Sequence, residues 1–480
     1  MILSRHGTDQ VCSRVTINKL PDEVLLDIFG FCMAYPLPPP PYEDDAWHTL
    51  VHVCRWWRYV VFGSSRRLNL RLLCTNGRLG KTLDIWPELP IVVHVDDWET
   101  LPMPLVTSVI SVLKRSDRVC KIIIGNVQNR LLLVTMNEPF PALIELELAS
   151  FKVGLPILPD SFLGGYVPRL RSLKLRGISI PGIRRLLLST RDLVTLSLGF
   201  TQKSGYTLPE RIVDILSALA RLKSLHLRFE IPPFRIHGAG RRPPGTVLTR
   251  VVLPVLTTFE FAGNSKFLGD IVSRINAPLE SIAVAMTHTD EDQLEFDISL
   301  LGDFIWHTKL LNAPYRADIF FTDYDSGISL FQRKGGVDFK VLDLAIPCFA
   351  SDLQLSGLVQ VCNSLLLPLP GLEHLSIHKS KSEFWSLRWQ VEVENTQWLE
   401  FLRSFIAVKD LVLDERVILF LASTLQGLVG EQVTEILPLL QNIVLEGFPS
   451  SRPVPKGIAT FIAAREVCGC PVVVDHQERK

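Results

Sequence analysis

The sequence lacks an excess of charge of either sign. Its 480 residues include 50 Lys plus Arg and 50 Asp plus Glu, so the formal net charge is zero. A protein dedicated to nucleic acid usually shows a basic excess, so this composition predicts no nucleic-acid partner. Apolar residues make up 47% of the chain, which is enough for a sizeable core and argues against extended disorder.

Long apolar runs are also missing. The longest uncharged, largely apolar run is 417–430, shorter than the roughly 18 to 20 residues of a membrane span. We therefore expect a buried helix there and no membrane partner. The opening residues MILSRHGTDQ show no apolar segment like that of a signal peptide. The nine cysteines are odd in number and scattered, which favours reduced thiols in an intracellular protein, cytoplasmic or nuclear.

Signatures of catalysis are absent from the sequence as well. No GxSxG, P-loop or Rossmann fingerprint occurs. His48 and His52 have the spacing of a zinc pair on a helix, but without the HExxH glutamate we expect them to flank an apolar face. His374 and His378 show no metal-ligand pattern around them, and GAGRRPPG (238–245) reads as a basic loop. We expect no enzyme, catalytic residue, metal or cofactor.

What the sequence does contain begins with two short amphipathic segments. NKLPDEVLLDIFGFC (18–32) predicts a helix, because Pro21 suits its first position and two acidic residues follow in the first turn. A second helix is expected from about 45 to 61, where apolar residues recur from Trp47 onward. Four prolines (38–41) between them predict a polyproline II segment, either a connector or a ligand for an SH3-like or WW-like module. Two such helices cannot bury their apolar faces on each other, so the rest of the chain or another protein must cover them.

LPDEVLLDIF (20–29) followed by LVHVCRWWRYVV (50–61) resembles the F-box, and 66–74 with 83–93 resembles the segment that follows it in fungal members. The resemblance implies a three-helix module that binds a Skp-family adaptor and joins a cullin–RING ubiquitin ligase. A proline-rich connector and Trp56 depart from the family pattern. The residues that the resemblance places on or beneath the adaptor-binding face are Leu20, Pro21, Leu25, Ile28, Phe29, Leu50, Val53, Cys54 and Trp57.

From about residue 119 onward the pattern apolar-x-x-apolar-x-apolar recurs. Clear copies start at residues 143, 170, 193, 222, 256, 279, 339, 372, 408 and 440, with an earlier copy at 119 and a degraded one at 315. The last two apolar positions of each copy alternate with polar ones, which predicts a short strand with one buried face. Helical stretches lie between copies, most clearly at 181–190, 208–222, 266–275 and 397–407.

Repeated strand, turn and helix units stack into an arc with a parallel sheet inside and helices outside. The fold class is therefore α/β, and the array resembles the irregular leucine-rich repeats that accompany F-boxes; an unrelated α/β domain is the alternative. Only FEFAGN (259–264) ends in the Asn of the full repeat signature. Insertions are expected near 229–250 and 285–338. The predicted divisions are a disordered N-terminus (1–15), an F-box-like module (16–66) with a proline-rich insert (36–45), a linker and start of the solenoid (67–118), the solenoid (119–467) and a tail (468–480).

A solenoid binds partners through side chains that project from its concave strands. The residues predicted to contact a target protein are Lys174, Arg176, His226, Arg228 and Glu260. Other side chains expected on this face are Glu145, Glu147, Ser197, Asp343, Ser376, His378 and Asp414. Mixed charge suits protein recognition, although an ordinary solvated sheet face is the alternative.

The sequence thus predicts a substrate-recognition subunit of a cullin–RING ligase, with an adaptor at one end and a target protein on the arc. The alternative is an interaction scaffold in which the N-terminal helices cap the repeat array.

Overall fold

The structure of the chain is a computed structural model. It describes residues 17, 20–34, 47–75, 86–98, 100–127, 130–150, 157–159, 161–178, 183–200, 209–229, 250–287, 299–308, 314–322, 325–347, 351–365, 367–379, 395–428 and 430–477. The predictions for 1–15, the proline-rich insert 36–45 and the basic loop 238–245 lie outside the described residues.

Three helices form the N-terminal part: α1 (Asp22–Ala34), α2 (Trp47–Val53) and α3 (Arg55–Gly63). The prediction of one helix from about 45 to 61 is wrong, because the helix is interrupted at Cys54. The backbone of Cys54 is extended (φ −158°, ψ 171°), and its Sγ accepts a hydrogen bond from the backbone N–H of Trp57 at 3.4 Å. Cys54 therefore acts as the N-cap of α3, where a side-chain acceptor satisfies an unpaired N–H.

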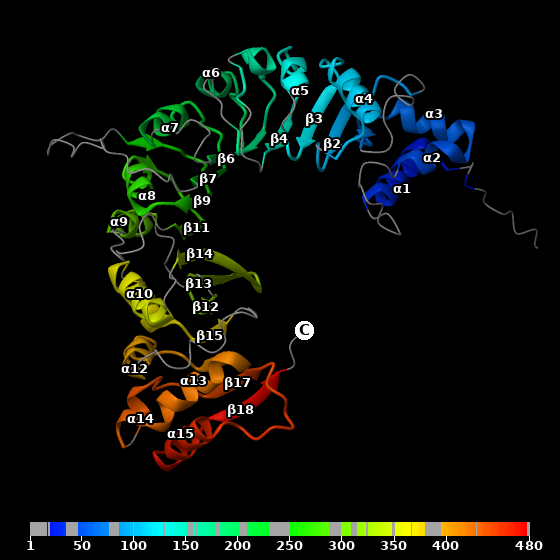
Figure 1. Ribbon diagram of the computed structural model, residues 1–480. Helices are drawn as coiled ribbons and strands as arrows, with labels where there is room; N and C mark the ends of the chain where they lie inside the picture. The colour runs from blue at the N-terminus through cyan, green and yellow to red at the C-terminus, as the bar shows by residue number, and fades with distance from the viewer. Residues whose placement is uncertain are drawn as a thin grey trace, which may run out of the picture.

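One sheet of 16 strands runs through the rest of the chain and lines the inside of an arc, with helices on its outer side (Figure 1). In sheet order its strands are β1 (Leu72–Cys74), β2 (Ile91–Val95), β3 (Val119–Ile124), β4 (Glu145–Ala149), β5 (Ser172–Arg176), β6 (Thr195–Phe200), β7 (Ser224–Phe229), β9 (Thr258–Gly263), β11 (Ser281–Met286), β14 (Val337–Pro347), β13 (Asp325–Lys334), β12 (Arg316–Phe321), β15 (His374–Lys379), β16 (Asp410–Asp414), β17 (Asn442–Glu446) and β18 (Val473–Gln477). A separate pair, β8 (Val251–Val252) and β10 (Ile275–Asn276), lies outside this sheet.

The helices between the strands are short. They are α4 (Met103–Leu113), α5 (Arg130–Thr135), α6 (Ile183–Leu188), α7 (Pro209–Leu216), α8 (Ser265–Val272), α9 (Ser299–His307), α10 (Ser351–Ser364), α12 (Asn395–Arg403), α13 (Glu415–Gln426), α14 (Gln432–Glu435) and α15 (Lys456–Val467), with 3-10 turns η3 (Phe162–Gly165) and η4 (Leu369–Gly371). The four helical stretches singled out in the sequence and the buried helix at 417–430 are confirmed as α6, α7, α8, α12 and α13.

Every copy of the repeated pattern, the earlier one at 119 included, is a strand, and the alternation within it has the expected cause. In β5, Leu173 and Leu175 are buried beneath the helices, whereas Lys174 and Arg176 are exposed on the other face. In the FEFAGN copy, the Oδ1 atom of Asn264 accepts a hydrogen bond from the backbone N–H of Lys266 at 2.8 Å and caps α8. Apolar side chains from all repeats join one continuous core.

The sheet departs from a simple repeat at its middle. Among the described strands only β13 runs against its neighbours, since β12–β13 and β13–β14 are antiparallel and the other pairs are parallel. The predicted insertion 285–338 therefore contributes two strands to the sheet, and a hairpin follows β12 in place of a helix. Gly335 and Gly336, with φ of 60° and 83°, form its turn, a conformation that favours glycine.

Both ends of the sheet extend beyond residues 119–467, the range predicted for the solenoid. Strands β1 and β2 lie within the segment 67–118 that was expected to include its start. The prediction of a tail from 468 onward is wrong for 473–477, because β18 pairs in parallel with β17. Within the part of the chain that the structure describes, no helix combines the length and apolar character needed to cross a membrane.

Candidate functional site

The N-terminal helices bury a small core of their own. Leu25, Phe29 and Leu50 are buried, and the rings of Phe29 and Trp57 lie 4.7 Å apart between centroids. Three of the nine residues that the resemblance places at the adaptor thus support the module from inside. Burying side chains of this size contributes about 1.5–3 kcal/mol each, so the helices hold together partly through their own packing.

The same helices leave several large apolar side chains exposed. On α1 the exposed side chains Val24, Ile28 and Phe31, with 42%, 36% and 70% of their surface accessible, follow the i, i+4, i+7 spacing of one helix face. Val53 at the end of α2 and Tyr59 on α3 are 58% and 75% exposed. We call these five residues the apolar helix face.

Ile28 and Val53 were expected at the adaptor on the strength of the resemblance, together with Pro21 and Cys54, which are also exposed. Leu20 and Trp57 are partly buried. Val24, Phe31 and Tyr59 were missed because the prediction followed family positions. The spacing of Val24, Ile28 and Phe31 would have revealed a second apolar stripe.

One aromatic contact joins the helices to the start of the sheet. The Trp47 indole Nε1 donates a hydrogen bond to the backbone carbonyl of Arg71 at 2.9 Å, directly before β1. The Trp86 ring lies 5.4 Å from that of Trp47 and 5.9 Å from that of Phe62. His48 and His52 also lie against Trp86, so they flank the aromatic cluster as expected.

The concave face of the sheet carries polar side chains that are paired across neighbouring strands. Lys174 Nζ lies 3.1 Å from Glu147 Oε2, and His226 Nδ1 lies 2.6 Å from Glu260 Oε2. Because parallel strands stand about 4.8 Å apart, side chains at the same register meet in this way. Two of the predicted target-binding basic residues, Lys174 and His226, therefore have carboxylate partners on adjacent strands.

A hollow of about 340 Å³ lies in the middle of this face. Arg176, Gly199 and Arg228 occupy one register across β5, β6 and β7, and the glycine leaves room between the two arginines. The floor beside them consists of small side chains: Ala262, Ala283, Ala285 and Ala345. Four of the five predicted target-binding residues line the hollow, namely Arg176, His226, Arg228 and Glu260, whereas Lys174 does not.

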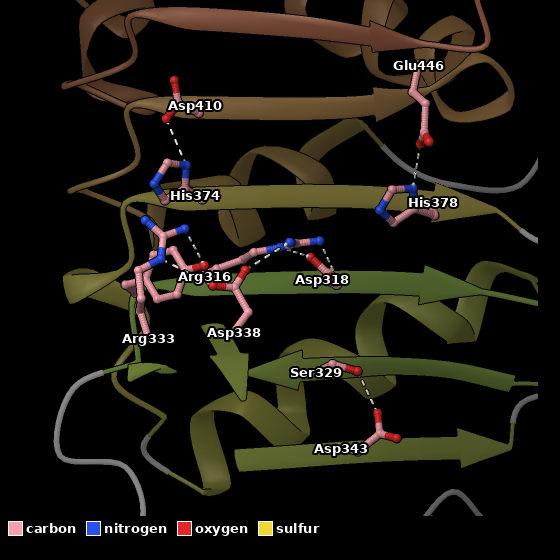
Figure 2. A network of polar contacts seen from close by, with 11 residues as sticks. Arg316, Asp318, Ser329, Arg333, Asp338, Asp343, His374, His378, Asp410 and Glu446 are labelled. Carbon is pink, nitrogen blue, oxygen red and sulfur yellow. Dashed lines mark hydrogen bonds and ion pairs between the residues drawn. The ribbon is translucent and has the colours of Figure 1, made fainter. Parts of the chain in front are cut away.

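The hairpin of β13 and β14 is tied to the sheet by a charged network (Figure 2). Arg316 of β12 has its Nη1 3.6 Å from Asp338 Oδ2 in the hairpin, and Arg333 Nε lies 3.2 Å from Asp338 Oδ1. The Arg333 guanidinium also stacks on the Tyr315 ring at 4.4 Å. Hydrogen bonds from Tyr315 and then Arg333 lower the pKa of the Asp338 carboxyl.

Two histidines further along the face have carboxylate partners on other strands (Figure 2). His374 Nδ1 lies 2.8 Å from Asp410 Oδ2, and His378 Nδ1 lies 3.3 Å from Glu446 Oε2. Sequence reasoning found no ligand pattern here because the partners come from β16 and β17. Asp414, expected to project from the concave face, is instead fully buried, and its Oδ1 accepts a hydrogen bond from the backbone N–H of Arg416 at 2.9 Å.

No protein-family model matches this sequence. No curated protein matches it either. Among solved structures, the leucine-rich repeat-containing protein LegL7 from Legionella pneumophila is similar at 12% identity and a TM-score of 0.28, over 73% of this chain and 98% of that chain.

Proposed function

We propose that this protein is the substrate-recognition subunit of a cullin–RING ubiquitin ligase. Helices α1–α3 bind a Skp-family adaptor, and the concave face of the sheet binds a target protein. The observation that carries the proposal is the apolar helix face, because exposed apolar side chains gathered on one short module favour a protein partner. Its position at one end of the arc leaves the concave face open (Figure 1).

In this proposal the chain carries out no bond chemistry and acts only by holding the target protein close to the conjugating enzyme. A receptor that holds an acceptor lysine near a charged conjugating enzyme raises the effective concentration of the two reacting groups. The bond-forming residues then belong to other subunits. The hollow around Arg176 and Arg228 supports a protein target, since it combines charged walls with an apolar floor.

The adaptor contact can be tested with the purified full chain and a Skp-family adaptor in a calorimetric titration. We expect Ile28→Glu and Val53→Glu each to weaken binding by about tenfold or more, because a carboxylate would be buried without a partner. Both side chains are exposed in the free protein, so neither substitution should unfold the helices.

Leu419→Glu is the control, since Leu419 on α13, far along the chain, is 57% exposed, about as much as Val53 and more than Ile28. It should bind the adaptor as the unsubstituted chain does. Equal affinity of all four proteins, or no binding by any, would reject the assignment. Phe29→Ala is unsuitable as a probe because Phe29 is buried and its loss costs about 3–5 kcal/mol of stability.

The contact between Trp47 and Trp86 supports a second candidate, a scaffold in which the helices cap the array. A cap stabilises the first repeats, so Trp86→Ala should lower the unfolding temperature of the full chain while adaptor binding stays absent. Strong adaptor binding that survives Trp86→Ala would instead favour the ligase subunit.

A further inference from the structure

Strands β15, β16 and β17 carry two triads of polar side chains at equivalent registers. The first triad is His374, Asp410 and Asn442, which are paired in register at the start of the three strands. The second is formed four residues later by His378, Asp414 and Glu446, the last two again in register. The triads share a histidine and an aspartate and differ in the third member, which is an amide in one and a carboxylate in the other.

Hydrogen bonds within the first triad satisfy its members. Asp410 Oδ2 lies 2.8 Å from His374 Nδ1, and Asp410 Oδ1 accepts a hydrogen bond of 2.6 Å from Asn442 Nδ2. One carboxylate is thus held between two donors. Both oxygens of this carboxylate are thus engaged by side chains of the triad itself.

The second triad places two carboxylates on neighbouring strands, where like charges destabilise a sheet. Donor atoms of His378, Asp414 and Glu446 all lie within 4.8 Å of one another. Asp414 is fully buried, whereas the other two side chains are about a quarter exposed on the concave face. Two acidic groups this close, one without access to water, favour a cation between them.

One distance within this triad is compatible with ligation. His378 Nδ1 and Glu446 Oε2 are 3.3 Å apart, longer than the about 2.7–2.9 Å of a charge-assisted hydrogen bond. Ligand atoms bound tetrahedrally at about 2.0–2.1 Å lie about 3.3–3.4 Å from each other.

We propose that His378, Asp414 and Glu446 bind a divalent transition-metal ion of the zinc class. One imidazole nitrogen and two carboxylate oxygens form a borderline donor set that suits Zn²⁺ or Co²⁺ better than Ca²⁺. Three protein ligands leave a fourth position, which lies on the concave side of the sheet, where the side chains of His378 and Glu446 are about a quarter exposed. Water or a side chain of a bound protein fills it, so the ion ties three repeats together and offers a contact to the target.

The test uses the full chain, stripped with chelator and titrated with Co²⁺ and Zn²⁺. We expect one equivalent of tightly bound ion, with a Co²⁺ absorption spectrum typical of four-coordination. His378→Ala and Glu446→Gln should each weaken binding by about tenfold or more. His374→Ala removes the histidine of the other triad on the same strand and should bind the ion normally.

Thermal unfolding supplies a second readout that misfolding cannot imitate. Without metal, Glu446→Gln should melt close to the temperature of the unsubstituted chain, because the loss of repulsion from Asp414 offsets the loss of the pair with His378. With Zn²⁺ the unsubstituted chain should melt at the higher temperature, since it gains more binding energy than the weaker-binding variant. Absence of a stoichiometric ion, or equal loss of binding in His374→Ala, would overturn the proposal; adaptor binding, which depends on α1–α3, does not enter either result.

Discussion

Arg465 shows how a single residue organises the last repeat. Its side chain is 1% exposed, and its two terminal nitrogens donate to carbonyl oxygens of α14 and of the segment between α14 and β17. Burial lowers the pKa of this guanidinium, because the charged form is desolvated. The five acceptors are the carbonyl oxygens of Val433, Ile436, Leu437, Pro438 and Leu440.

Arg465→Ala should destabilise the protein by at least about 3 kcal/mol, because several buried carbonyls would lose their donor at about 1–3 kcal/mol each. Arg465→Lys keeps the positive charge but has fewer hydrogen-bond donors, so its stability should lie between those of the unsubstituted protein and Arg465→Ala. Urea denaturation measures both. Arg403→Ala is the control, since its pair with Glu435 is half exposed at 3.8 Å and should contribute about 0–1 kcal/mol. Equal losses at the two sites would contradict this account.

Cysteine reactivity follows burial in the same residue-by-residue way. Cys32, Cys54 and Cys468 are exposed thiols, whereas burial raises the pKa of both Cys74 and Cys362 to about 12. Iodoacetamide at neutral pH should therefore modify the first three in the native protein and the other two only after unfolding. Because the pKa of a buried thiol is raised in the folded state, the thiol contributes stability below its ordinary pKa of 9.0. This contribution is lost as the pH rises toward 12. Labelling of Cys74 or Cys362 in the folded chain would disprove the assignment.

At the scale of the element, the strands could be predicted and their order could not. The apolar spacing of FKVLDL (339–344) is the same as in other copies, and β14 is indeed a strand. Nothing in that spacing shows that β14 pairs with β13 on one side and β11 on the other. The break between α2 and α3 was missed because Trp47 to Val61 keeps a helical apolar period across Cys54, whose capping role is set by its extended backbone.

The hairpin of β13 and β14 depends on Asp338, which receives hydrogen bonds from Tyr315 and Arg333. Asp338→Asn should speed amide hydrogen exchange at residues 331–340 while leaving β4–β6 unchanged. Because the pKa of Asp338 is lowered from 3.8, its contribution is present at neutral pH and is lost as pH falls through the lowered value. Acid should thus loosen the hairpin of the unsubstituted chain, and the variant should respond less. Identical acid sensitivity would count against this role.

At the scale of the whole molecule, each repeat packs mainly on its neighbours along one continuous sheet. The arc could be predicted from the repeat, but the hollow could not. Arg176, Gly199 and Arg228 are brought together only by the register between β5, β6 and β7. The carboxylates facing His374 and His378 likewise depend on which strands are neighbours, and no sequence spacing encodes that distance.

Nearest-neighbour packing predicts that damage stays local. Ile443→Ala in β17 removes a fully buried side chain, at a cost of about 2–5 kcal/mol. Hydrogen exchange should rise in β16, β17 and β18 and remain unchanged in β3–β6, as in other quasi-one-dimensional arrays. The corresponding variant at the other end of the sheet, Leu146→Ala in β4, should raise hydrogen exchange in β3–β6 and leave β16, β17 and β18 unchanged. A uniform rise along the whole sheet would mean that the arc unfolds as one unit.

The reversed strand β13 also limits how strands can be added to the middle of the sheet. Strands β12 and β14 point the same way because two reversals cancel, so β11 and β15 each meet a neighbour of their own polarity. An array of this kind can gain or lose strands at its midpoint two at a time without upsetting either flank. A single additional antiparallel strand would instead give β11 or β15 a neighbour of opposite polarity.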